Sequence, residues 1–439
     1  MNGIQRLFTL FLLFTVGLVS QAQETPRTID FEQWSIHGQA TSIAQGHGQF
    51  RSPYSGDNSL PGHSESYASY TTTLYLGRRL WSGAEIYVNP ELSGGRGIGD
   101  VSGIAAYPNG DLVHVNGHEP AVNLARVFLR QTFDFGIEAG RVEPAQNQLA
   151  GYQSTSRLTL TLGRLTPSDL FDNNSYAHDP RTQFMNWALV DNGAWDYPAN
   201  AHDYTWGGVI DYNQPRWALR YGLFMVPTGA DNVHFDHNFG HAQSHVLELE
   251  LRYDLWNRPG KLRVLGFWNR ANMGNFREAL DSGNPDLAIE DVRRYSSKRG
   301  AGINLEQELA EGLGAFSRLG WNDGQTETLG FTDINQTFSL GLSLKGGRWH
   351  RVEDQVGLAG VINGLSTSHR DFLAAGGTSL IIGDGKLNYA HEEIMELYYS
   401  LKISTGIFAT ADYQFINHPG YNHDRGPVSV WGLRLHAEF

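Results

Sequence analysis

The chain has 439 residues, with 33 Lys and Arg against 46 Asp and Glu, and its formal net charge is −13. This acidic balance argues against a nucleic-acid partner, because no basic stripe is available to neutralise phosphates. The absence of cysteine excludes a disulfide scaffold, a cysteine-based zinc site and a cysteine nucleophile. Abundant Gly, Tyr, Trp and Phe with only 5 Met predict an all-β chain.

Residues 1–22 have the pattern of a secretory signal peptide. Arg6 supplies the positive charge, an apolar run covers 7–19, and small residues precede a cleavage point expected after Ala22. A membrane anchor is the alternative, but a spanning helix needs about 20 apolar residues and this run is shorter. We therefore expect residues 23–439 to form one exported domain, either soluble or a β-barrel.

Segments that alternate apolar and polar side chains occupy most of the remaining chain. Leu247, Leu249 and Leu251, for example, alternate with Glu248 and Glu250. Successive side chains of a strand face opposite sides, so each segment has one apolar and one polar face. Sixteen strands are predicted, at 33–43, 66–78, 83–91, 122–134, 156–164, 203–213, 216–226, 244–256, 261–270, 300–309, 313–322, 333–344, 354–363, 393–404, 406–416 and 428–439.

Long and short connections alternate between these strands. The connections at 44–65 and 364–392 are long, whereas 214–215 is short; the long even-numbered connection 135–155 is an exception that the pattern does not explain. Tight periplasmic turns, long outer loops and an even strand count are typical of outer-membrane barrels. The sequence therefore predicts an all-β, 16-stranded antiparallel transmembrane β-barrel with both termini on the periplasmic side. A secreted two-sheet sandwich or a multi-domain β protein is the alternative.

The polar faces of the strands indicate what passes through such a barrel. If the apolar faces contact lipid, then Arg126, Arg130 and Arg220 face the lumen, together with acidic residues in nearly equal number. A wall of mixed charge argues against an anion pore and against a strong cation pore. With its aromatic residues, this wall suits a neutral polyhydroxylated solute. For most of these charges, however, pairing between neighbouring strands is the preferred interpretation.

The long connection 165–202 is predicted to fold inward and constrict the pore. Asp179 and Pro180 suit the N-cap and first position of a helix that Asn192 and Gly193 would end. A long loop with its own helix and several aromatic residues is not expected to extend freely into solvent. Alternatively, its aromatic residues only pack the loop onto the wall. The candidate solute contacts in this loop are Tyr176, Arg181, Asn186, Trp187, Trp195 and Asp196.

The same region carries a family resemblance. The stretch LTLTLGRLTPSDLFDNNSYAHDPRTQFMNWALVDNGAWDYPAN resembles the carbohydrate-selective porin family of the OprB type, in which a strand ending in a Gly-basic pair leads into an S-D-x-F-D-x-N motif and an F-M-N-W helix. RVFLRQTF with NQLAG upstream and IIGDGKLNYAHEEIMELYYSLKI downstream are also similar. The resemblance covers roughly 70–439 and implies an outer-membrane barrel that passes glucose and similar sugars. By position, the family motif covers Arg164, Asp169, Phe171, Asp172, Asn174, Phe184, Met185, Asn186 and Trp187.

Other functions have weaker support in the sequence. Four histidines in HFDHNFGHAQSH could bind a metal, but a polar surface loop is the preferred interpretation. No G-x-S-x-G motif occurs, and neighbouring carboxylates alone do not define a glycosidase. We therefore predict a porin without enzymatic activity, metal or cofactor; a secreted or surface β protein that binds or degrades polysaccharide is the alternative. The predicted pore-lining residues are Arg126, Arg130, Arg164, Asp169, Tyr176, Arg181, Asn186, Trp187, Trp195 and Arg220.

The expected partners follow from the predicted location in the bacterial outer membrane. They are small neutral sugars, membrane lipid and the barrel-insertion machinery, which we expect to recognise the C-terminal strand that ends at Phe439. The sequence leaves the oligomeric state and the preferred sugar open.

Overall fold

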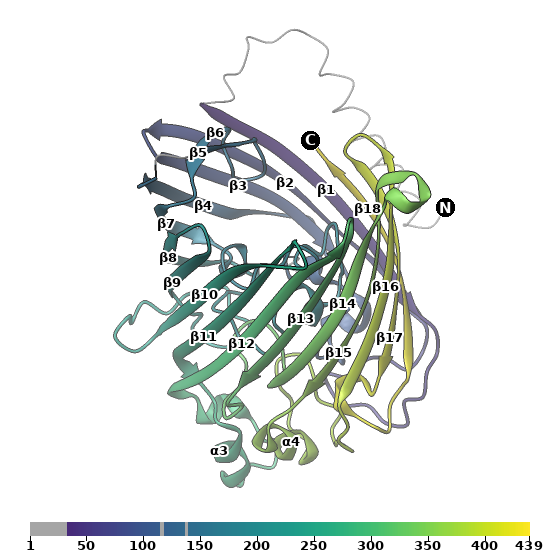
Figure 1. Cartoon of the computed structure of the whole chain (residues 1–439). Helices are drawn as coiled ribbons and strands as arrows, with labels where there is room; N and C mark the ends of the chain where they lie inside the picture. The colour runs from purple at the N-terminus through teal and green to yellow at the C-terminus, as the bar shows by residue number, and fades with distance from the viewer. Residues whose placement is uncertain (1–32, 115–117, 137–138) are drawn as a thin grey trace.

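A computed structural model describes residues 33–114, 118–136 and 139–439; the predicted signal peptide, 1–22, lies outside these residues. Sixteen of the described strands close into one antiparallel barrel (Figure 1), which confirms the predicted fold class. The barrel strands are β1 (Trp34–His47), β2 (Glu65–Trp81), β3 (Ala84–Gly95), β4 (Ala121–Asp134), β7 (Arg157–Leu165), β8 (Thr205–Asn213), β9 (Trp217–Phe224), β10 (Gln243–Leu255), β11 (Arg258–Met273), β12 (Arg294–Ala310), β13 (Leu313–Asn322), β14 (Gln336–Gly346), β15 (Arg351–Gly364), β16 (Glu392–Ser404), β17 (Ile407–Asn417) and β18 (Val428–Glu438).

The first and last strands pair to close the barrel. Gln39 of β1 lies opposite Glu438 of β18, and the register continues to His47 opposite Val430. Phe439 extends this pairing, because its backbone N and O each lie 3.1 Å from the O and N of Gly38. Closure pairs the first and last strands, so the sheet of described barrel strands has no free edge.

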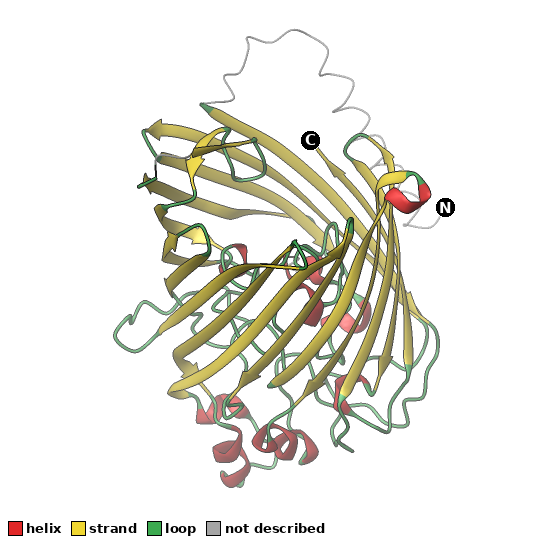
Figure 2. Cartoon of the chain, viewed as in Figure 1, coloured by secondary structure: helices red, strands yellow, loops and turns green. Residues whose placement is uncertain are grey.

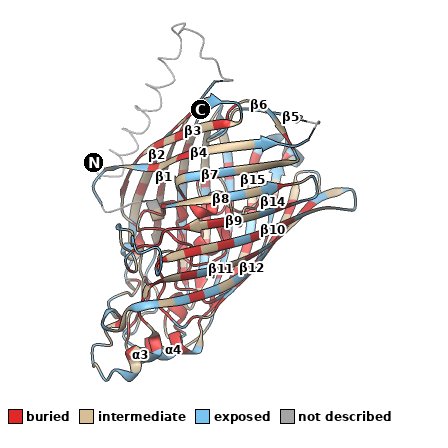
Figure 3. Ribbon diagram, turned by 90° about the vertical axis from the view of Figure 1, so that its left-hand side faces the viewer, coloured by how far each residue is buried: buried red, intermediate tan, exposed pale blue. Residues whose placement is uncertain are grey.

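Buried residues alternate with more exposed ones along the strands (Figure 3). Leu247 and Leu249 are 50% and 37% exposed, whereas Glu248 and Glu250 between and beside them are 0% and 3% exposed. The apolar face therefore points outward and the polar face inward. Period-two alternation was enough to locate all sixteen strands, although several extend beyond the predicted ends. β12 begins at Arg294 rather than at 300, because its first residues are mostly polar yet pair with β11.

The two ends of the barrel differ as the sequence predicts. Short turns such as Trp256-Asn257 connect the strands at one end, and both of these residues have the positive φ of a tight hairpin turn. The opposite end carries long loops with α3 (Phe276–Asp281) and α4 (Thr367–Ala374) (Figure 2). The start of β1 and the end of β18 lie at the short-turn end (Figure 1). No helix in the described part of the chain is long and apolar enough to cross a membrane.

Two long loops fill much of the barrel interior. Loop 2 (residues 96–114) and loop 3 (residues 166–204) contribute many of the fully buried side chains, among them Tyr107 and Phe184. Trp187 of loop 3 stacks against Phe331 of a later outer loop, with ring centroids 5.7 Å apart. The apolar core thus consists of loop side chains inside the barrel together with inward-facing side chains of the wall, such as Phe224 and Tyr398.

The exceptional connection on the short-turn side has a structure of its own. It contains β5 (Ala139–Val142) and β6 (Gly151–Ser154), which pair as a separate two-stranded sheet. We call residues 139–154 the periplasmic insert.

Candidate functional site

Loop 3 enters the lumen through a capped turn. Thr166 and Asp169 form a capping box around a short 3-10 segment, η3 (Pro167–Asp169). Asp169 accepts two hydrogen bonds from Arg126 of β4, from Nε to Oδ2 and from Nη2 to Oδ1, both at 2.6 Å. Burial alone would raise the pKa of Asp169, but the charge and hydrogen bonds of Arg126 outweigh it, so the pKa lies below its ordinary value.

Arg318 of β13 anchors the middle of loop 3. Its guanidinium is fully buried and donates to Oδ2 of Asp172 at 2.9 Å. It also donates to four carbonyl oxygens of the loop, including those of Ala177 at 2.8 Å and Leu189 at 2.7 Å. One wall residue therefore fixes three separate parts of the loop.

The helix predicted from Asp179 to Asn192 is wrong. After a single turn at Asp179, regular helix is limited to α2 (Trp187–Val190), with Asn186 as its N-cap. The barrel wall replaces the missing helical hydrogen bonds. Glu396 of β16 accepts from the backbone N of Met185 and Asn186, and Arg434 of β18 donates to two backbone carbonyls further upstream.

Arg181 is held on all three of its side-chain nitrogens. Nε donates to Asp111 at 2.7 Å, Nη2 to Glu91 at 3.0 Å and Nη1 to Tyr75 at 3.2 Å. Its guanidinium thus joins loop 3 to loop 2 and to strands β2 and β3. This clamp leaves Arg181 poorly suited to the sugar contact that the sequence predicts.

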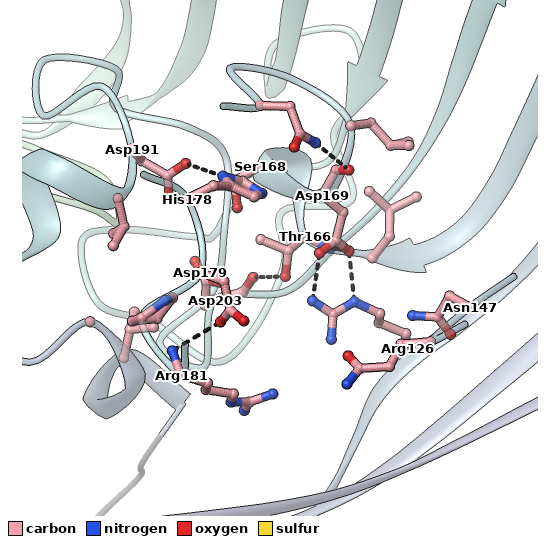
Figure 4. A pocket seen from close by; sticks show the side chains of 18 of the residues that line it. Arg126, Asn147, Thr166, Ser168, Asp169, His178, Asp179, Arg181, Asp191 and Asp203 are labelled. Atoms are coloured by element: carbon pink, nitrogen blue, oxygen red, sulfur yellow. Dashed lines mark hydrogen bonds and ion pairs between the residues drawn. The ribbon is translucent and has the colours of Figure 1, made fainter. Parts of the chain in front are cut away.

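A cavity of about 490 Å³ lies between loop 3, the wall and the periplasmic insert. Its size falls within the range of small-molecule sites, about 300–1,000 Å³. Figure 4 shows the loop residues His178, Asp179 and Arg181 on one side of it and Asn147 on the other, with the Arg126–Asp169 pair between. The lining also includes the aromatic residues Tyr75, Phe128, Trp187, Tyr197 and Phe331.

Two arginines of β4 retain hydrogen-bonding capacity at this cavity. Nη1 of Arg126 has no hydrogen-bond partner among the described residues. Arg130 donates through Nη1 to the carbonyl of Asn147 at 2.9 Å, and its guanidinium lies over the rings of Tyr87 and Phe128 at 5.1 and 5.3 Å. Its Nε and Nη2 have no partner in the described part of the chain.

The cavity brings together only half of the predicted pore-lining set: Arg126, Arg130, Asp169, Arg181 and Trp187. Trp187 is only 5% exposed, and its Nε1 donates to the carbonyl of Asn109. Most of the indole ring therefore packs loop 3 against neighbouring segments. The indole therefore offers the cavity an edge of its surface, and not the open face that the sequence suggests.

The other five predicted residues lie away from the cavity. Asn186 and Trp195 are fully buried within the loop core, and Tyr176 lies against Gly314 of β13. Arg220 is paired within the wall with Asp211, Glu248 and Glu250. Arg164 lies on the same outward-facing side of β7 as Leu162, and its Nε donates to the carbonyl of Leu124. The prediction that Arg164 lines the pore rests only on its position in the family motif, which does not take account of the face of the strand.

Sequence reasoning missed several residues that line the cavity. His178 and Asp179 lie within the loop that the sequence predicts to constrict the pore. Which of its side chains face the cavity depends on the backbone conformation of that loop. Gln146, Asn147 and Gln148 belong to the exceptional connection, whose unexplained length was the only signal available.

The histidine-rich segment makes contacts on the outside of the barrel. The His245 ring stacks on Trp268 at 5.1 Å, and its Nδ1 lies 2.7 Å from Tyr221 Oη. Across the described ranges, no group of three or more His, Cys, Asp or Glu side chains is placed to hold a metal ion.

The family model for carbohydrate-selective porins of the OprB family matches residues 28–439. The chain belongs to this family. Together with the closed barrel, membership makes it an outer-membrane porin for carbohydrates and not an enzyme, as the sequence predicts. Its apolar outer face also conflicts with the alternative of a secreted polysaccharide-binding protein.

The porin also resembles solved structures. It matches Pseudomonas putida OprB at high pH with a TM-score of 0.70 and 17% identity, over 93% of this chain and 94% of that one. The low-pH structure of the same protein gives 0.51 and 13%, over 93% of each chain. The outer-membrane channel DcaP of Acinetobacter baumannii gives 0.51 and 8%, over 92% and 97%. These likenesses show the fold alone. A comparison with curated proteins returned no match.

Proposed function

We propose that the cavity between loop 3 and β4 is the sugar-selective part of the channel. A sugar needs hydrogen-bond donors and acceptors at close spacing, together with apolar surface for its C–H faces. The spare nitrogens of Arg126 and Arg130 are donors, and the carboxylates of Asp169 and Asp179 are acceptors. The rings of Phe128 and Tyr75 supply apolar surface in the same cavity.

The charge arrangement favours a neutral solute. Arg126 is neutralised by Asp169, and Arg181 is bound to two carboxylates, so neither presents an uncompensated charge. A guanidinium that is fixed by a bidentate pair has little freedom to lose when a ligand binds. A channel must also release its solute, which requires shallow contacts of this kind. In this proposal loop 3 is the constriction, as expected for 165–202.

The observation that carries the proposal is the Arg126–Asp169 pair with Nη1 of Arg126 left unbonded. Arg126→Gln removes this donor and the bidentate pair. We expect glucose to block ion current about 10- to 150-fold less tightly, since a hydrogen bond to a charged group contributes about 1.5–3 kcal/mol. Single-channel recording in planar bilayers measures this.

Lys261→Gln is the matched control. It removes one positive charge from the lumen wall, where Lys261 pairs with Glu306 at 2.9 Å, outside the cavity. The proposal expects wild-type glucose block from this variant. Equal weakening by both variants would mean that the charge of the lumen, and not a contact at Arg126, governs the block.

The proposal extends to assembly and to the membrane. The lipid-facing leucines of β10 suit a hydrocarbon environment, and the C-terminal strand ends on an aromatic residue that closes the barrel seam. We expect the insertion machinery to act on that terminal strand.

A further inference from the structure

We infer that the periplasmic insert is a second solute-binding element of this porin, facing the sugar from the side opposite loop 3. The inference rests on the proposed function, because it requires a sugar in the cavity. It assigns a role to a connection whose length neither the barrel fold nor loop 3 explains. Tight turns suffice at this end of a barrel.

The insert reaches the cavity through a tight turn. The backbones of Ala145 and Gln148 bond to each other in both directions, at 3.1 and 3.0 Å, which places Gln146 and Asn147 at the tip. Asn147 has a φ of 55°, a left-handed conformation that asparagine tolerates better than most residues. All three of Gln146, Asn147 and Gln148 line the cavity.

Four consecutive strands hold this tip in place. Ser35 of β1 donates to the carbonyl of Ala145 at 3.2 Å, and Arg79 of β2 donates to that of Ala150 at 3.0 Å. Tyr87 of β3 accepts from the backbone N of Leu149, and Arg130 of β4 donates to the carbonyl of Asn147. These contacts to backbone atoms fix the position of the tip and leave the side chains of Gln146 and Asn147 available, whereas Nε2 of Gln148 donates to the carbonyl of Glu143 at 2.8 Å.

An apolar contact adds to these hydrogen bonds. Leu149 is buried in a small cluster with Tyr87 and Phe128, whose rings lie 5.0 Å apart. These contacts hold the insert against the barrel wall, so its side-chain amides occupy a defined position before any solute binds. Preorganised groups bind a solute at lower entropic cost.

The side chains at the tip have the chemistry that sugar hydroxyls need. A carboxamide both donates and accepts, and it carries no charge to hold an ion. Figure 4 shows the Asn147 side chain directed toward the cavity, on the far side from His178, Asp179 and Arg181. Oδ1 of Asn147 is buried without a hydrogen-bond partner among the described residues. A solute in the cavity is thus contacted by loop 3 on one side and by neutral amides on the other.

The test is glucose block of single-channel current, with glucose added to one side at a time. The variant Gln146→Ala/Asn147→Gly removes two carboxamides, and glycine retains the left-handed backbone at 147. We expect block to weaken about 3- to 10-fold, as for the loss of one or two ordinary hydrogen bonds, with open-channel conductance close to wild type. Asn147→Asp keeps an acceptor of the same shape, so its block should stay within about twofold of wild type while its preference for cations rises.

Two controls make the outcome decisive. Tyr152→Ala alters an exposed side chain of the same insert outside the cavity and should leave block unchanged. If Arg126→Gln weakens block but Gln146→Ala/Asn147→Gly does not, the insert is only a wall and the inference is wrong, while the proposed function stands. An unchanged block in both variants would overturn the two together. A larger conductance without weaker block would also refute the inference, because it shows a purely steric role.

Discussion

Arg318→Met should detach loop 3 from the barrel wall without unfolding the barrel. The substitution keeps much of the side-chain length but removes the donors to the Asp172 carboxylate and to four loop carbonyls. Breaking a buried ion pair by removing one partner costs about 3–5 kcal/mol, and each buried carbonyl left unbonded costs about 1–3 kcal/mol.

These costs do not add, because the released groups find other partners. Burial already raises the pKa of Asp172, and Arg318 opposes that effect, so the carboxyl takes up a proton more readily in the variant. Water reaches the carbonyls once the loop moves. We expect the loop to lose about 3–5 kcal/mol of local stability, while the hydrogen-bonded barrel keeps its own.

Single-channel recording and limited proteolysis measure the effect. The variant should show larger and noisier conductance, weaker glucose block and faster cleavage within loop 3, with normal heat-modifiable migration of the barrel. Arg252→Met is the control, because Arg252 bonds to Glu250, Asn213 and the carbonyl of Gln214, outside loop 3. Wild-type conductance, noise and block in Arg318→Met would refute the view that this residue anchors the loop.

Three further predictions concern the barrel and its outer loops. Deleting Phe439 removes the last hydrogen bonds to Gly38 and should lower the folded, membrane-embedded fraction, measured by heat-modifiable migration; normal surface levels would refute a role for this terminus. Leu249→Arg places a charge against lipid at a cost of about 2–4 kcal/mol near the midplane, whereas the lumen-facing Glu248→Gln should still fold; equal folding yields in lipid would overturn the assignment of the two faces. Burial raises the pKa of Asp333, in an outer loop, to about 6, so its contribution to stability is full below pH 4 and is lost as pH rises through 6. Asp333→Asn should remove this loss of stability, which is about 3 kcal/mol at neutral pH. The variant's outer loop should therefore be cleaved more slowly than that of the wild type at pH 7.5 but not at pH 4. An equal difference in cleavage rate at both pH values would contradict the raised pKa of Asp333.

The barrel could be predicted because its determinants are local. Alternation along a strand such as 247–255 fixes which face is apolar, and the lengths of the connections fix which end carries the loops. The helix expected after Asp179 failed for a non-local reason. Glu396 and Arg434, more than 200 residues away, bind the backbone groups that a helix would have paired internally.

The site was predictable only in part for the same reason. Arg126 and Arg130 follow from strand parity, and Asp169 from the family motif. The burial of Asn186 and Trp195 depends on how several loops pack together inside the barrel, which no local pattern encodes. The contribution of 145–148 depends on a turn folding back against β1 to β4, and the sequence showed only that this connection was too long.

The concentration dependence of sugar uptake into liposomes tests the central claim most directly. A binding site in the cavity requires that the rate of glucose entry through the purified porin saturates, and that a second hexose competes with it. Arg126→Gln should raise the half-saturating concentration, and Lys261→Gln should not. Entry that rises linearly with concentration, and that is no faster than for a hydroxyl-poor neutral solute of equal size, would show that the channel only sieves by size and would contradict the account.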